Sequence, residues 1–131
     1  MDFPSSSNSA PNAYEKSARI TLTSGNNAKG SYATLLTTTR KSRWIQIELS
    51  DINDPGFWYY VDISTGATPR IIIPDIFCLT TSPVLNDTDL GSRVIFSGPI
   101  EIPAGLAVKA RLMVDARNAK TGVVVAHCGY R

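Results

Sequence analysis

The 131-residue sequence has one histidine, His127, and two cysteines, Cys78 and Cys128. Neither cysteine belongs to a C-x-x-C pair, so no structural zinc site is predicted. Because both lie in apolar runs, we interpret them as buried free thiols, with a disulfide between neighbouring strands as the alternative. A catalytic triad would need a nucleophile and a carboxylate around His127, and no G-x-S-x-G elbow is present. We expect no enzymatic activity, and an enzyme built around His127 is the least favoured alternative.

Charge and long apolar runs are also scarce. Only 18% of the residues are charged and the net charge is +2, with lysines and arginines scattered along the chain. This distribution does not favour nucleic-acid binding. No apolar run approaches the 18 residues of a membrane helix, and the start MDFPSSSNSAPNAY lacks the regions of a secretory signal. We therefore expect a protein that is made in the cytoplasm and binds no membrane.

Cofactor and metal motifs are missing as well. The stretch SGNNAKG lacks the Lys-Ser/Thr ending of a phosphate loop, and NDTDLG lacks the glutamate that completes a calcium loop. Both stretches have the composition of turns. The sequence predicts no cofactor and no metal.

What the chain does have is apolar alternation with a period of two. The stretch LAVKARLMV predicts an inward row, Leu106, Val108, Ala110, Leu112 and Val114. RWIQIELS and FWYYVDIS alternate in the same way, and RVIFSG, IEI and GVVVAHC predict shorter strands. In the preceding turn IPAG, we expect Gly105 to have a positive φ. About eight or nine such strands, with no helical stripe, predict an all-β fold: an antiparallel β-sandwich or jelly roll.

The first 16 residues differ from the rest. They are rich in Ser, Asn and Pro and show no hydrophobic period, so they cannot form a core of their own. We predict an extended N-terminal arm over residues 1–16 and a β-sandwich domain over residues 17–131. An arm of this composition gains order most simply by lying against another subunit, and its Phe3, Pro4 and Tyr14 are candidate contacts.

Outward-facing side chains supply the other candidate interface residues. If Tyr59 points inward, Trp58 and Tyr60 point outward, and Lys109 and Arg111 lie outward on the strand after IPAG. Outward aromatic residues are typical of protein interfaces. A stacking platform for sugar rings and a second packed layer are the alternatives. Basic residues on a half-exposed face more often meet the carboxylates of a neighbour, or water, than a substrate.

Four stretches together resemble one family: KGSYATLLTTT, WYYVDISTGATPRIIIPDI, FSGPIEIPAGLAVKARLMV and TGVVVAHCGYR. They are similar to the small β-sandwich virion proteins of tailed bacteriophages over roughly residues 28–129. The matching positions are Gly30, Tyr32 and Leu35 in the opening strand, Asp62, Ile63 and Gly66 in a turn, residues 72–76 in the next strand, and residues 102–105 with Arg111. Tyr32 stands where the family commonly has tryptophan.

The resemblance implies a structural component of the virion without enzymatic activity. Our leading interpretation is a capsid decoration protein that docks on other virion proteins, such as the major capsid protein, and forms homo-oligomers. The alternative is a carbohydrate-binding or receptor-binding module of a phage tail or fibre that uses Trp58, Tyr60 and Trp44.

Overall fold

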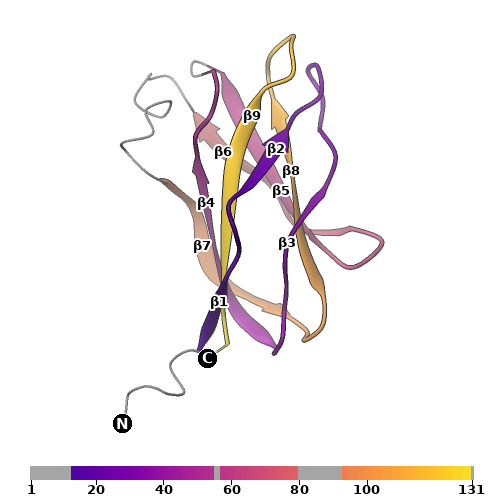
Figure 1. Ribbon diagram of the computed structural model, residues 1–131, viewed down its shortest axis with the longest axis vertical. Helices are drawn as coiled ribbons and strands as arrows, with labels where there is room; N and C mark the ends of the chain where they lie inside the picture. Colours follow the sequence, from indigo (N-terminus) through magenta and orange to yellow (C-terminus); the bar gives the residue numbers. More distant parts are fainter. Residues whose placement is uncertain (1–12, 55–56, 80–92, 131) are drawn as a thin grey trace.

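The structure is a computed structural model, and it describes residues 13–54, 57–79 and 93–130. These residues form nine β-strands, and none of them lies in a helix that could cross a membrane. The strands are β1 (Tyr14–Lys16), β2 (Ile20–Thr23), β3 (Ala33–Thr37), β4 (Ser42–Ser50), β5 (Trp58–Thr65), β6 (Arg70–Leu79), β7 (Arg93–Ile102), β8 (Ala107–Val114) and β9 (Thr121–Gly129). They form two antiparallel sheets facing each other, so the predicted all-β sandwich is confirmed (Figure 1).

The two sheets are named here after their most connected strands. In the β9 sheet the order is β1-β9-β4-β7, and β2 also pairs with β9. In the β8 sheet the order is β3-β8-β5-β6. Four pairings are nested like one long folded hairpin: β5 with β6, β4 with β7, β3 with β8, and β2 with β9. The pairings of β9 with β4 and of β8 with β5 complete the two sheets.

The core lies between the sheets and is built from the predicted inward rows. The fully buried side chains of β4, β5 and β8 follow the period of two: Ile45, Ile47, Tyr59, Val61, Ile63, Val108, Ala110, Leu112 and Val114. The hydroxyl of Tyr59 donates to the carbonyl oxygen of Asp54 at 2.7 Å, which satisfies its one buried polar group. Burial raises the pKa of Tyr59 to about 12. Gly105 has a φ of 80°, as predicted for the IPAG turn.

The strand β7 corrects our division of RVIFSG and IEI into two strands. It runs unbroken from Arg93 to Ile102, and Gly98 and Pro99 pair with Ile45 and Trp44 of β4. Because β7 is the last strand of its sheet, Pro99 loses no ladder hydrogen bond on the open side. A Gly-Pro pair in an edge strand therefore does not end it.

The beginning of the described chain is held by the β9 sheet. Tyr14, which we assigned to the arm, starts β1 and pairs with Gly129 near the end of β9. The carbonyl oxygen of Ala13 accepts a hydrogen bond from the backbone N–H of Tyr130 at 2.8 Å. Phe3 and Pro4 lie outside the described residues, so their predicted contacts stay predictions.

Both cysteines are buried free thiols, which was our first interpretation. Cys78 lies in β6 and Cys128 in β9, so they belong to different sheets. Burial raises the pKa of each thiol, which keeps the thiols protonated and unreactive.

Candidate protein-docking face

The outer face of the β8 sheet carries a group of aromatic side chains, exposed Trp58 and Phe77 and half-buried Tyr60, which we call the aromatic ridge. The Trp58 and Phe77 rings meet edge to face, with centroids 5.2 Å apart. The Tyr60 ring lies 5.5 Å from that of Phe77. Trp58 is 49% exposed and Phe77 is 47% exposed, although both side chains are large and apolar. Half-buried Met113, opposite Tyr60 on β8, continues the ridge across the sheet.

Local backbone geometry explains why Phe77 belongs to this face. Ile73 and Ile76 are both buried, so the inward period of two is interrupted between them. The interruption coincides with Asp75, whose φ is 48°, and with a register shift against β5. Such a β-bulge changes which residues point outward, and Pro74 before it is tolerated because β6 is an edge strand. Phe77 is consequently exposed and Cys78 buried.

The centre of the same face holds a buried carboxylate. Asp62 of β5 is 2% exposed and accepts three hydrogen bonds or ion pairs. One oxygen accepts from Nε of Arg111 and Nζ of Lys29, each at 2.8 Å, and the other accepts from the backbone N–H of Asp75 at 2.8 Å. Lys29 also lies 3.4 Å from the carboxylate of Asp75. We call Asp62, Arg111, Lys29 and Asp75 the ionic cluster.

The charge state of this cluster follows from its contacts. Burial by itself would raise the pKa of Asp62, but the hydrogen bonds from the Asp75 backbone, Lys29 and Arg111 hold it below the usual value. The hydrogen bond to Asp62 raises the pKa of Lys29 above its usual value. Asp62 is therefore ionised at neutral pH, and its negative charge is matched within the chain.

The strand-like segment before β3 covers the ionic cluster. Tyr32 lies under the guanidinium of Arg111, which is 4.6 Å from the ring centroid, and its hydroxyl accepts from Ser64 at 2.7 Å. The backbone N–H of Gly30 donates to the carbonyl oxygen of Leu112 on β8 at 2.8 Å. A Cβ on Gly30 would lie only 1.8 Å from the carbonyl oxygen of Thr23, so no other residue fits this crossing. The centre of the face is thus closed by the chain itself.

The predicted interface residues fall into separate groups. Trp58 and Tyr60 lie together in the aromatic ridge. Arg111 lies on the same face but pairs with Asp62 of its own chain, and Nζ of Lys109 donates to the carbonyl oxygen of Ala67 at 3.3 Å. Tyr14 lies on the other sheet. That these residues form an interface stays a prediction.

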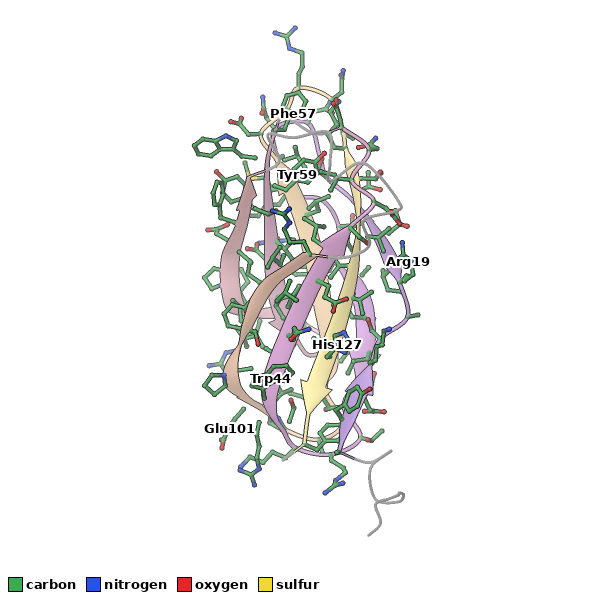
Figure 2. All side chains as sticks on the ribbon, turned by 90° about the vertical axis from the view of Figure 1, so that its left-hand side faces the viewer. Arg19, Trp44, Phe57, Tyr59, Glu101 and His127 are labelled. Carbon is green, nitrogen blue, oxygen red and sulfur yellow. The ribbon has the colours of Figure 1, made fainter. Side chains whose placement is uncertain are left out.

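On the β9 sheet, Tyr14 and His127 form a second group. Tyr14 is 54% exposed, and its ring stacks on that of His127 with centroids 6.3 Å apart. Nε2 of His127 lies 3.2 Å from a carboxylate oxygen of Glu48, off the line of a good hydrogen bond. Figure 2 shows His127 and Trp44 toward one end of the molecule and Tyr59 toward the other. His127, on β9, therefore lies between Glu48 of β4 and Tyr14 of β1.

The described residues offer little else that could do chemistry. Among residues 13–54, 57–79 and 93–130, no three His, Cys, Asp or Glu side chains gather closely enough to hold a metal ion. A cleft of about 580 Å³ lies between β2 and the segment leading to β3. Thr21, Thr23, Ser31 and Tyr32 line it, and its one charged lining residue, Lys29, is already paired with Asp62.

Sequence reasoning missed Phe77, Lys29 and the burial of Asp62. The dipeptide Pro74-Asp75 inside an apolar strand was a usable signal, because proline in a strand marks an edge or a bulge. No local signal could reveal that Asp62 meets Lys29 and Arg111, since these residues are brought together only by the pairing of distant strands.

Comparison with known proteins does not assign the chain to a family. No family model matches the chain, and no curated protein matches it significantly. Two solved structures of a pentameric capsid protein isolated from metagenomic phage sequences are similar, with 17% and 18% identity and TM-scores of 0.31 and 0.29. They cover 82% and 81% of this chain, which in turn spans about three fifths of theirs, 59% and 60%. The fold assignment rests on the strand order above and not on these similarities.

Proposed function

We propose that the chain is a non-enzymatic structural component of a bacteriophage virion, a decoration protein of the capsid that docks on neighbouring virion proteins. The docking surface is the aromatic ridge, assisted by the residues before β1. The partner is another virion protein, such as the major capsid protein.

The observation that carries the proposal is the exposure of the aromatic ridge, on a sheet face whose centre is closed by the chain itself. About half of Trp58 and half of Phe77 is open to water. Covering on the order of 100 Å² on each side chain would contribute roughly 2.5 kcal/mol per residue. That magnitude is typical of the few aromatic residues that dominate a protein interface.

The topology and the sequence resemblance support the same class of protein. The nested pairing of β2 to β9 resembles that of a jelly roll, an architecture used by viral capsid proteins and also by lectin domains and cupins. Fold alone does not choose among these functions. The likeness of residues 28–129 to phage virion proteins favours the first.

A carbohydrate-binding module is the second candidate, and the ring geometry speaks against it. The Trp58 and Phe77 rings are inclined by 70° and the Tyr60 and Phe77 rings by 47°. A flat platform for several sugar rings would need these aromatic faces in one plane, and they are not. Tilted rings suit the irregular apolar surface of a protein partner.

Incorporation into particles tests the proposal. The chain, carrying an affinity tag, is supplied in cells producing the phage that encodes it, and its copies per purified particle are counted. We expect wild-type chain and Val94→Ser to be incorporated alike, because Val94 is equally exposed, at 49%, but lies on β7 of the other sheet. Trp58→Ser/Phe77→Ser should lower incorporation at least tenfold. Absence of the wild-type chain from particles, or specific binding to a glycan array, would contradict the proposal.

A further inference from the structure

The aromatic ridge and the residues before β1 fit each other between two copies of the chain. We propose that the Phe3-Pro4 segment of one copy docks on the aromatic ridge of a second copy. This inference rests on the proposed function, because it names the partner that first covers the docking surface. It makes the chain a self-assembling unit.

The composition of the first twelve residues supports this occupant. In MDFPSSSNSAPN, Phe3 and Pro4 form an apolar pair, and Ser and Asn make up most of the residues that follow. Proline restricts its own φ, so a segment that contains it loses less conformational entropy when its apolar residues dock on aromatic rings. The ridge supplies such rings, with Trp58 edge-on to Phe77 and Tyr60 tilted beside it.

The position of Ala13, where the described chain begins, bears on whether the Phe3-Pro4 segment reaches the ridge of its own copy or of another. Ala13 and β1 lie at the end of the sandwich where β9 finishes. The ridge lies at the opposite end, because the carbonyl oxygen of Trp58 accepts from the N–H of Asp115 in the turn between β8 and β9 (Figure 1). It also belongs to the opposite sheet. The segment therefore starts at the corner of the molecule farthest from its own ridge.

Chain length then favours docking on another copy. Strand and sheet spacings put about 30 Å along the strands and about 25 Å around the sandwich between Ala13 and Trp58, a surface path close to 40 Å, and the path to Tyr60 is roughly 5 Å shorter. Ten residues back from Ala13, Phe3 can lie at most about 35 Å away, so it reaches its own ridge only if the whole segment is fully extended. The ridge of a neighbouring copy has no such limit. The contact is heterologous, since an arm meets a ridge, and such contacts close into rings or continue as chains.

Two complementary variants of the full chain test the inference by sedimentation velocity. Phe3→Ser removes the anchor and keeps the ridge, whereas Trp58→Ser/Phe77→Ser removes the ridge and keeps the anchor. We expect the wild-type chain and Val94→Ser to self-associate, and each of the two variants alone to have a dissociation constant at least tenfold higher. Mixing them should restore association, because intact anchors of one variant meet intact ridges of the other.

The mixing experiment separates this contact from its competitors. If ridges pair with each other, Phe3→Ser associates as tightly as the wild-type chain, and the inference is wrong. If the mixture associates no better than its components, or the wild-type chain stays monomeric at all concentrations, the inference is also wrong. Particle incorporation is counted separately, so incorporation that depends on the ridge but not on Phe3 would retain the proposed function and reject the arm contact.

Discussion

The outer face of the β8 sheet carries Asp62 at its centre and Trp58 at one end, and the two side chains have very different surroundings. The charged residue is 2% exposed and meets three donors of its own chain. Trp58 is 49% exposed. Among the described residues, its one aromatic ring contact is with Phe77. Polarity and exposure are thus the reverse of what a folded monomer usually shows.

This contrast separates the two roles of one face. The ionic cluster is complete within the chain, so its groups have no charge left to offer a partner and act on stability. The aromatic ridge is half exposed, so we expect it to act on association. We therefore expect substitutions in the ionic cluster to change stability and substitutions in the aromatic ridge to change association.

The largest effect should come from the core beneath both regions. Val108 of β8 has no exposure to water, and its neighbours are apolar. Val108→Asp would bury an unpaired carboxylate at a cost of several kcal/mol, and we expect it to unfold the domain. Circular dichroism of the soluble fraction checks this. A cooperative thermal transition close to that of the wild-type chain would contradict the assigned inward row.

The next largest effect is expected from the ionic cluster. Asp62→Ala leaves Arg111 and Lys29 without their buried partner and orphans the backbone N–H of Asp75. We expect a loss of roughly 3–5 kcal/mol in the free energy of unfolding, measured with urea. Asp62→Asn, which keeps an acceptor for Asp75, is the matched control and should lose less. Equal stability of the alanine variant and the wild-type chain would show that the cluster is not a structural unit.

Removing one donor should cost less than removing the acceptor. In Arg111→Ala, Asp62 keeps the ion pair with Lys29 and the hydrogen bond from Asp75. We expect a loss of about 1–2 kcal/mol in the free energy of unfolding and little change in particle incorporation. Lys109→Ala, which loses a hydrogen bond of 3.3 Å to Ala67, should change stability by less than about 0.5 kcal/mol. An incorporation defect without a stability defect would place Arg111 in the docking surface instead.

Lowering the pH should also test the ionic cluster, because the pKa of Asp62 is lowered in the folded chain. The folded-state pKa of Asp62 is lowered, so the stability it contributes is present above the unfolded value, near 3.8, and is lost as pH falls through the folded value. We expect the gap in unfolding free energy between the wild-type chain and Asp62→Asn to be constant above about pH 5 and to narrow below about pH 4. A gap that stays constant down to pH 2 would contradict the lowered pKa.

The ridge should affect stability less than removal of Asp62 does. Trp58→Ser/Phe77→Ser removes side chains that are about half in water and half packed on the domain, so the free energy of unfolding should fall by about 2 kcal/mol, below the loss expected for Asp62→Ala. Thermal unfolding at low protein concentration, where association is absent, measures this. A melting temperature lowered as far as in Asp62→Ala would mean that the ridge is structural and would remove the distinction between the two regions.

The sequence predicts the inward side of this face better than the outward side. Alternation at residues 59–63 and 106–114 predicts which side chains are buried, because a strand between a core and water has a strict period of two. The same rule fails at Phe77, where the bulge at Asp75 shifts the period. It also treats Asp62 as an ordinary outward residue, since burial there depends on how β3, β8 and β5 lie side by side.

The same cause limits how much of the candidate site can be predicted from the sequence. Trp58 and Tyr60 could be recognised because two aromatic residues on the outward row of one strand need a reason to be there. Arg111 looked equally available, because its partner Asp62 lies 49 residues earlier in the chain. Pairing across such separations is set by register, and register is not written in either strand alone.

The nested pairing of strands also has a consequence for the order in which the chain can fold. Among the described strands β1 and β2 come first in the sequence, yet both pair with β9, which comes last. Of the pairings between described strands, only the innermost hairpin, β5 with β6, joins neighbours in sequence, and each further nested layer closes a longer loop. Loops of this kind slow folding, because their entropy is lost before the contacts form. During synthesis β1 and β2 therefore stay unpaired with β9 until the residues of β9 have left the ribosome.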